Sequence, residues 1–175
     1  TITIANSFGG DYEAVNIFTA LMATKLMKAD LVVVGIGPGH VGTNTVLGFS
    51  GVELAFYIQA VKILRGKSLL IPRISFADKR KRHYLISHHT LTLLEQLIIN
   101  PIEVVFPDIK IIKNNTVSLK KYKHNLFYYN LNKIYHILKE SKYDFRSMGK
   151  NFKEDPIFFI TAGLAVKRLL EIKKR

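Results

Sequence analysis

The most informative stretch of the sequence reads Leu31-Val-Val-Val-Gly-Ile-Gly-Pro-Gly-His-Val-Gly42. Its first half, residues 31–36, is an apolar run rich in valine, which is typical of a strand that is buried on both faces. Its second half opens a glycine-rich loop that extends to Gly51. A buried strand that leads into such a loop is typical of a parallel sheet in an α/β protein.

Strand and helix patterns alternate on both sides of this stretch. Further short apolar runs end at turn residues and predict strands over residues 2–5, 68–74 and 102–106. Helical spacing or length predicts helices over residues 14–26, 52–64 and about 92–99, with Asp11 as a helix N-cap and a capping box at Thr92 and Glu95. The alternation predicts a three-layer, Rossmann-like α/β domain with a mainly parallel sheet over residues 1–108.

Residues 109–175 are less regular and are expected to form a basic α+β extension of that core. Residues 109–119 suggest a hairpin, and residues 128–138 suggest a helix. Asp155-Pro156 marks the start of a last helix, because Asp is a good N-cap and Pro is favoured at the first helical position. This helix is predicted to run to about residue 173 and to pack on the core.

Composition narrows the class of protein. The chain has 175 residues, of which 48% are apolar and 22% charged, so it is long enough for one domain with a hydrophobic core and is not disordered. It has no cysteine, which excludes disulfides, thiolate zinc sites and iron–sulfur clusters. Its uncharged apolar runs are too short to cross a bilayer. A soluble, cytoplasmic protein without a membrane partner is expected.

The net charge of +13 is concentrated in one part of the chain. Residues 1–108 carry a net charge of +2, whereas residues 109–175 carry +11. A basic surface of this kind can bind a polyanion such as nucleic acid. Most of the excess lysines are scattered among Asn, Tyr and Ile without an RNA-binding signature, so a solvated basic face is the preferred interpretation.

The loop from Gly35 to Gly51 holds six of the eleven glycines and matches G-x-G-x-x-G at residues 37–42. A dinucleotide-binding loop should open a helix here, yet polar residues continue the loop, and Arg73 stands where a ribose-binding acid is expected. A Walker loop fails because Thr43-Asn44 follows Gly42.

A more general role remains for this glycine loop. Its backbone N–H groups and hydroxyls can bind an anion, and seventeen residues is long for a connection with no function. The alternative is a tight loop that uses glycine only for its conformational freedom. The candidate ligand-binding residues are Gly37, Gly39, His40, Gly42, Thr43, Thr45 and Ser50.

A second candidate segment, residues 72–90, follows the third predicted strand. In a parallel sheet it emerges on the same edge as the glycine loop, so the two are expected to meet. Its arginines are suited to phosphate or carboxylate and are Arg73, Arg80 and Arg82. Its histidines can act as acid, base or ligand and are His83, His88 and His89. With five Lys+Arg and only one acid, Asp78, the segment should attract anions.

A metal site is the alternative for Asp78 and these histidines. Histidines five and one residues apart do not share a helical face as a zincin pair does, although a loop-built site remains open. We therefore predict an anion and no metal. The predicted catalytic residues are Asp11, Asp78, His88 and His89. The predicted ligand-binding residues outside the glycine loop are Arg73, Ser75, Arg82, His83 and Ser147, the last from a small-residue turn, Ser147-Met-Gly149, ahead of the final helix.

Several blocks together carry a resemblance to a known family: Gly9-Gly-Asp-Tyr-Glu-Ala-Val-Asn16, Gly37 to Gly51, Pro72-Arg-Ile-Ser-Phe-Ala-Asp78, Arg82-His83, Ser87-His-His-Thr90 and Ser147-Met-Gly149. The chain resembles a bacterial family known as domain of unknown function 3866. The similarity covers nearly the whole chain, which looks like the C-terminal half of a longer family protein. The resemblance implies an N-terminal half as a partner and implies no activity.

The features taken together favour an α/β enzyme domain that binds a small anionic ligand, phosphorylated or nucleotide-like. No cofactor is identified, and a homo-oligomer is expected. One alternative is a non-catalytic module for ligand sensing or oligomerisation within a longer protein. Another is nucleic-acid binding through residues 109–175.

Overall fold

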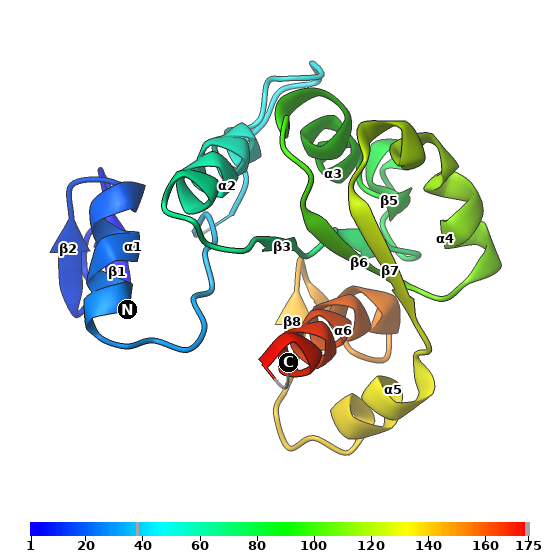
Figure 1. The fold of residues 1–175 in the computed structure, drawn as a ribbon. Coiled ribbons are helices and arrows are strands. Elements are labelled where there is room, and N and C mark those ends of the chain that lie inside the picture. The colour runs from blue at the N-terminus through cyan, green and yellow to red at the C-terminus, as the bar shows by residue number, and fades with distance from the viewer. Residues whose placement is uncertain (38, 174–175) are drawn as a thin grey trace. The chain divides into compact units, whose positions relative to one another are not determined.

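The computed structural model describes residues 1–37 and 39–173. The chain divides into two compact units, and the second begins at Leu69. The two units are described separately below, and their helices and strands are labelled in Figure 1. The boundary expected near residue 108 falls inside the second unit, where a strand ends and a helix begins, and it stays a prediction.

The first unit begins with two short strands, β1 (Ile2–Ile4) and β2 (Tyr12–Ala14), which pair in parallel. The helix α1 (Ile17–Leu26) follows. Asn16 caps it by accepting from Thr19 N at 3.1 Å, while the Thr19 hydroxyl accepts from Asn16 N at 3.2 Å. The expected cap at Asp11 is therefore wrong. Asp11 is exposed, and its carboxylate lies 2.5 Å from the amino group of Thr1.

The strand predicted over residues 31–36 is not formed, and among the described residues this segment pairs with no strand. Its valines are exposed, Val33 by 83%. A valine run favours extended backbone, but a strand also needs a neighbour whose N–H and C=O groups complete the ladder. Here β1 pairs with β2 instead, so the expected parallel pair of residues 2–5 and 31–36 is wrong.

The predicted helix over residues 52–64 is present as a 3₁₀ turn, η1 (Ser50–Val52), followed by α2 (Glu53–Ile63). It ends where Arg65 adopts a left-handed φ of 60° and Gly66 N donates to Val61 O at 2.8 Å. The sequence of this helix is apolar nearly all round and would suit a well-buried helix, but Ala60 is the only residue of α2 that is buried.

The second unit is built on a parallel three-stranded sheet in the order β3 (Leu69–Leu70), β6 (Glu103–Pro107) and β7 (Asn125–Tyr129). The central strand β6 is apolar and buried, with Val105 packed against Ile160 and Leu164 of α6 (Pro156–Lys173). The helix α5 (Asn132–Lys139) packs beside α6, and both lie on the same side of β6 and β7 in Figure 1.

The strand predicted over residues 68–74 divides at Pro72, which lacks the N–H that a sheet ladder requires. The part before it is β3, whereas the part after it becomes β4 (Ile74–Ser75) and pairs antiparallel with β5 (Leu85–Ile86). A 3₁₀ turn, η2 (Lys81–His83), lies between β4 and β5.

The next helix, α3 (His88–Thr92), continues into a π-helical turn, η3 (Leu93–Leu97). The Ser87 hydroxyl caps α3 by accepting from His89 N at 3.3 Å. The capping box predicted at Thr92 and Glu95 is therefore wrong, because the helix begins before Thr92.

The hairpin expected over residues 109–119 is also wrong. Those residues form α4 (Lys110–Asn115) and the start of a 3₁₀ segment, η4 (Val117–Tyr122). The predicted helix over residues 128–138 starts later, at α5, because its first residues complete β7. A small antiparallel pair, β8 (Arg146–Ser147) and β9 (Lys150–Asn151), precedes α6. The start predicted for the last helix is confirmed, and α6 extends as far as Lys173, the last residue that the structure describes.

The arrangement is mixed α/β with parallel and antiparallel pairs, so the broad class is confirmed. The single, mainly parallel Rossmann-like sheet is not confirmed, because the described residues form four short sheets instead. No helix of residues 1–37 or 39–173 combines the length and the apolar character needed to cross a membrane.

Candidate functional site

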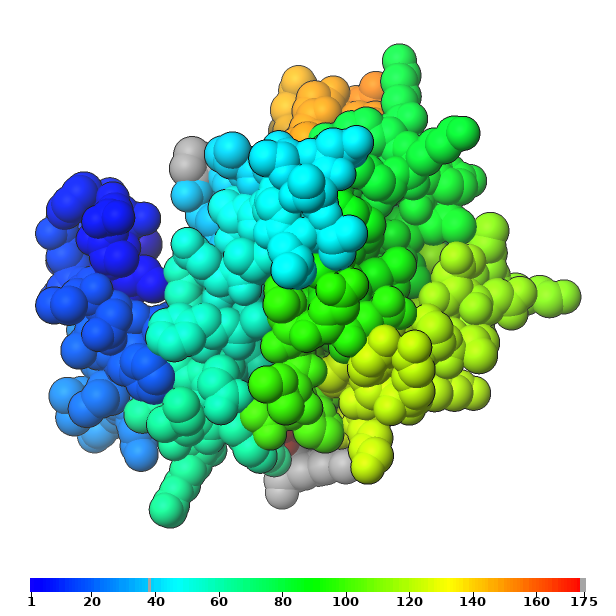
Figure 2. Space-filling model, turned by 90° about the horizontal axis from the view of Figure 1, so that it is seen from above, coloured from blue at the N-terminus to red at the C-terminus, as the bar shows by residue number. Residues whose placement is uncertain are grey.

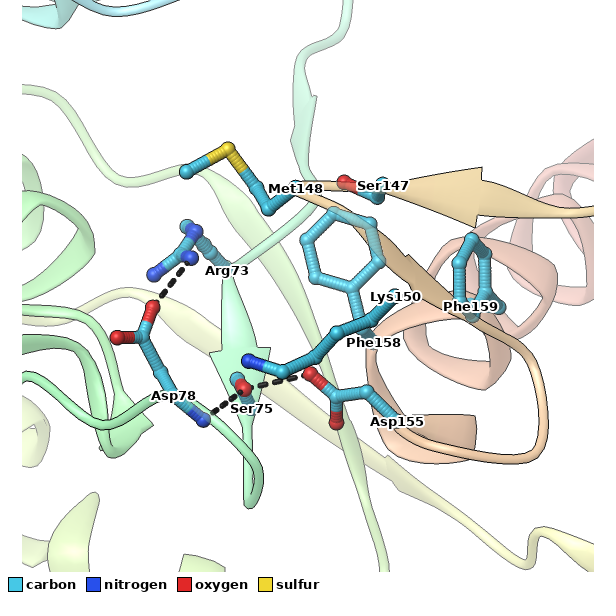
Figure 3. Close-up of a pocket in the computed structure, with 9 residues that line it drawn as sticks. All are labelled: Arg73, Ser75, Asp78, Ser147, Met148, Lys150, Asp155, Phe158 and Phe159. Atoms are coloured by element: carbon cyan, nitrogen blue, oxygen red, sulfur yellow. Dashed lines mark hydrogen bonds and ion pairs between the residues drawn. The ribbon is translucent and has the colours of Figure 1, made fainter.

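A pocket in the second unit gathers four residues that the sequence singled out, and Figure 3 shows its lining. Its volume is about 260 Å³, including space open to solvent. We call it the Arg73 pocket, and its lining consists of Arg73, Ser75, Asp78, Ser147, Met148, Lys150, Asp155, Phe158 and Phe159. Segments more than seventy residues apart in the sequence thus meet at one place.

The two sides of the Arg73 pocket come from short antiparallel pairs. Arg73 precedes β4, and Asp78 lies in the turn that follows it. On the other side, Ser147 and Lys150 are paired across β8 and β9. The turn between them has positive φ at both Met148 and Gly149, 54° and 74°, as a two-residue hairpin turn requires.

Asp78 is held by two guanidinium groups. Its Oδ2 accepts from Arg73 Nη2 at 2.8 Å and from Arg80 Nη2 at 2.9 Å, and its Oδ1 accepts from Arg80 Nε at 3.0 Å. These hydrogen bonds, those from Arg80 first, hold the pKa of Asp78 well below its usual range despite its burial. The carboxylate is therefore ionised at neutral pH, which suits positioning of the arginines better than proton transfer.

The guanidinium group of Arg73 is only partly hydrogen-bonded. Its Nη2 is bonded to Asp78, but its Nη1 is buried and has no hydrogen-bond partner within the described part of the chain. The backbone of Arg73 is fixed, because its N–H donates to Thr90 Oγ1 at 3.0 Å and its C=O accepts from Ser87 N at 2.9 Å. The guanidinium is thus held in place with an N–H group available.

The Ser75 hydroxyl makes hydrogen bonds that stabilise the fold. Its hydroxyl donates to Asp155 Oδ2 at 2.5 Å and accepts from Ala77 N and Asp78 N at 3.2 and 3.0 Å. Asp155 also accepts from Phe76 N at 3.4 Å, so its carboxylate joins the start of α6 to β4. Asp155 thus stands directly before Pro156, the first residue of α6, as the sequence predicts, and its side chain connects this helix to β4. Ser75 therefore shapes the Arg73 pocket.

Lys150 is a pocket residue that sequence reasoning did not predict as part of a site. It is half-buried, and among residues 1–37 and 39–173 its ammonium makes no ion pair. A signal for it was present, because Ser147-Met-Gly is a tight-turn sequence and the residue after such a turn faces the residue before it across a hairpin.

The three histidines of the second segment form a cluster, although sequence spacing did not place them on one helical face. His83 ends η2 and is 3% exposed, while His88 and His89 open α3. One ring nitrogen from each lies within 4.8 Å of the others. The β4–β5 pair brings the end of η2 back against the start of α3, and we call this group the histidine cluster.

Burial and neighbouring cations keep part of the histidine cluster neutral. Burial, with the charges of Arg73 and Arg80, lowers the pKa of His83 to about 4. Burial and Arg82 also lower the pKa of His88. The Nδ1 atom of His83 lies 2.8 Å from Ser87 Oγ. Neutral rings are poor proton donors at pH 7, but their ring nitrogens can bind a metal.

The glycine loop lies in the first unit, and its residues form hydrogen bonds with one another. Gly42 and Phe49 form an antiparallel bridge, and Thr43 N donates to Gly48 O at 2.6 Å. The Ser50 hydroxyl accepts from Val41 N at 3.1 Å. The hydroxyls of Thr43 and Thr45 lie 2.9 Å apart, where a Cβ on Gly48 would collide with them. These side chains thus support the loop itself.

The remaining predicted residues divide between the units. Asp11 and the loop residues Gly37, Gly39 and His40 lie in the first unit, whereas Arg82, in η2, lies in the second. The meeting of the glycine loop with residues 72–90, and a shared catalytic role for Asp11 and the histidines, therefore stay predictions.

The structure thus defines an α/β chain whose second unit carries an arginine-lined pocket and a histidine cluster. A family described as Protein of unknown function (DUF3866) matches residues 1–166, and the chain belongs to this family. The match confirms the resemblance and covers nearly the whole chain, not only a C-terminal half. The place of the chain within a longer protein stays a prediction. No curated protein and no solved structure matches the chain.

Proposed function

We propose that this chain binds a small anionic ligand, such as the phosphate or carboxylate group of a metabolite, in the Arg73 pocket. The observation that carries the proposal is the buried Nη1 of Arg73, which lacks a hydrogen-bond partner among the described residues. A buried donor without an acceptor costs about 1–3 kcal/mol. An oxyanion in the pocket supplies that acceptor through a charge-assisted hydrogen bond.

The charges around the pocket support an anion. Arg73, Arg80 and Lys150 face two carboxylates, Asp78 and Asp155, so one positive charge is in excess. Arg80 is occupied by Asp78, and Asp155 by Ser75. The donors that remain for a ligand are the Arg73 guanidinium, the Lys150 ammonium and the Ser147 hydroxyl.

The size of the pocket limits the ligand. Its volume of about 260 Å³ includes space open to solvent, so the enclosed space is much smaller than a site for a drug-sized ligand. It suits one phosphate or carboxylate group better than a whole dinucleotide. An enzyme of small phosphorylated metabolites and a ligand-sensing module both begin with this binding step.

The lysine-rich residues 110–142 are a weaker candidate for a ligand site. Their lysines are exposed, and most of them lie in α4, η4 and α5. Figure 2 shows side chains of the yellow-green segment, near residues 110–125, extending into solvent. Several lysines lie over tyrosine rings of this chain, as Lys121 does over Tyr122 at 4.8 Å. Nucleic-acid binding through this region stays a prediction.

Thermal unfolding in sodium phosphate, with sodium chloride at equal ionic strength as reference and EDTA throughout, tests the proposal. Phosphate at about one hundred times its Kd should stabilise the wild type by about 2.7 kcal/mol. Arg73→Ala should abolish the response and keep the fold, because Asp78 retains Arg80. Lys150→Ala should weaken it.

Lys153→Ala is the matched control, since Lys153 is exposed and does not line the pocket. It removes the same charge three residues from Lys150 and should leave the phosphate response unchanged. Equal responses of the wild type and Arg73→Ala, with near-ultraviolet circular dichroism showing both folded, would refute binding in the Arg73 pocket.

A further inference from the structure

We propose that the histidine cluster is a binding site for a transition-metal ion of the zinc type. His83, His88 and His89 each offer one ring nitrogen, and these atoms lie within 4.8 Å of one another. Tetrahedral zinc with Zn–N bonds of about 2.0–2.1 Å places its nitrogens about 3.3 Å apart. The rings therefore need to approach by roughly 1.5 Å at most, which side-chain rotation can supply.

Ser87 orients the most buried ligand. Its Oγ lies 2.8 Å from Nδ1 of His83 and also accepts from the backbone N–H of His89 at 3.3 Å. When Nδ1 of His83 carries the proton and donates to this oxygen, the lone pair of the neutral ring is at Nε2. A metal-binding histidine typically donates its other N–H to such a partner, which fixes its tautomer and ring plane.

The backbone around the cluster is preorganised. His83 N donates to Arg80 O at 2.9 Å within η2, and Leu91 N donates to Ser87 O at 3.1 Å in the first turn of α3. Ser87 N in turn donates to Arg73 O at 2.9 Å, so the start of α3 is joined to the residue before β4. Ligands on hydrogen-bonded elements lose little conformational freedom when they bind a metal.

The imidazole ligands determine which metal ions the histidine cluster can bind. Three imidazoles suit Zn²⁺, Co²⁺, Ni²⁺ and Cu²⁺, whereas Mg²⁺ and Ca²⁺ require oxygen ligands. The nearby carboxylate of Asp78 is already bonded to Arg73 and Arg80. Three protein ligands leave the fourth tetrahedral position open, as in catalytic zinc sites.

The arginines around the cluster indicate what would occupy the open position. Arg73, Arg80 and Arg82 all act on the histidines electrostatically, so a divalent ion enters a positively charged region. An anionic fourth ligand, such as hydroxide or an oxyanion, would offset that charge. The metal proposal depends on the histidines and not on the Arg73 pocket. An experiment can therefore refute either the metal proposal or the anion proposal without refuting the other.

The test is titration of the untagged, EDTA-treated and dialysed full chain with CoCl₂ and ZnCl₂. We expect one Co²⁺ per chain with the intense visible d–d absorption of a tetrahedral site, and its loss when Zn²⁺ is added. MgCl₂ should not displace Co²⁺. His88→Ala and His89→Ala should each weaken binding at least about tenfold while the far-ultraviolet spectrum is unchanged.

His136→Ala is the matched control, because His136 is exposed on α5 and is not part of the cluster. It should leave Co²⁺ affinity as in the wild type. Absence of a tetrahedral Co²⁺ spectrum overturns the proposal. So does Co²⁺ affinity that is unchanged in His88→Ala and His89→Ala, or that is lost in His136→Ala.

Discussion

The two terminal nitrogens of Arg73 have different surroundings. Nη2 is bonded to Asp78, which also accepts two hydrogen bonds from Arg80, while Nη1 is buried without a partner among the described residues. Asp78 thereby decides where both guanidinium groups lie. Asp78, which the sequence predicts as a catalytic residue, is in this geometry better suited to position the two arginines.

Asp78→Asn should destabilise the protein by roughly 2 kcal/mol. The substitution removes a carboxylate that is 8% exposed and leaves Arg73 and Arg80 close together without their counterion. Urea unfolding at pH 7 measures the change. Asp144→Asn is the control, since Asp144 and its partner Arg146 are both exposed, and it should change stability little. Equal effects of the two substitutions would contradict this role of Asp78.

The same residue predicts a pH dependence. Because hydrogen bonds from Arg80 and Arg73 lower the pKa of Asp78 in the folded state, its contribution is present above about pH 4 and decreases as the pH falls. The stability difference between the wild type and Asp78→Asn should therefore be constant from pH 6 to 7 and shrink below about pH 4. Urea midpoints over this range test it, and a difference that grows on acidification would be inconsistent.

At the scale of elements, the β8–β9 pair forms one side of the Arg73 pocket, and the β4 segment forms the other. It places Ser147 and Lys150 opposite one another through a turn in which Gly149 has a φ of +74°. No neighbour within 4 Å would meet a Cβ at that glycine. Its conformation, rather than space, is what requires glycine there.

Gly149→Ala should therefore cost about 1–2 kcal/mol of stability and also weaken phosphate binding, because the turn that positions Lys150 is strained. Urea unfolding and the phosphate titration measure the two effects. Gly35→Ala serves as the control, since a Cβ there meets nothing within 4 Å and no left-handed φ is needed. If phosphate affinity survives Gly149→Ala, the hairpin does not position the ligand.

An ion pair between Arg168 and Glu103 joins the helix α6 to the sheet. Arg168 Nε and Nη2 donate to the two carboxylate oxygens of Glu103 at 2.7 and 2.8 Å, and its guanidinium lies over the Phe127 ring at 3.7 Å. The hydrogen bonds to Glu103 raise the pKa of Arg168. It links α6 to β6 and β7, and so secures the helix whose first residues line the Arg73 pocket.

At the scale of the whole molecule, both candidate sites lie within the second unit. The boundary at Leu69 follows Arg65 and Lys67, which are exposed. Limited trypsin digestion should cut there and release a C-terminal fragment that unfolds cooperatively and retains Co²⁺ binding. Mass spectrometry and circular dichroism of the fragment test this, and rapid degradation to small peptides would show that the second unit does not fold alone.

The fragment also tests the predicted role of the glycine loop. If phosphate binds as tightly to the fragment as to the full chain, the Arg73 pocket is sufficient and the loop in the first unit contributes nothing. Loss of affinity in a folded fragment would support the expectation that residues 35–51 meet residues 72–90.

Local signals in the sequence determined several features on their own. Asp155-Pro156 located the start of the last helix, and the apolar run before Phe106 located the central strand. Tight-turn residues singled out Ser147, which lines the Arg73 pocket. Each depends on backbone preferences that neighbouring residues determine. The family resemblance was likewise carried by short blocks, and the family match confirms it.

Tertiary structure alone decided the rest. The valines of residues 31–36 favour an extended chain but cannot choose a neighbour, and here they have no strand partner among the described residues. The histidine cluster depends on η2 being brought back against α3, and the Arg73 pocket on residues more than seventy positions apart. Pairing and packing of this kind are contacts between distant segments, so their free energy depends on the folded arrangement and not on any one stretch of sequence.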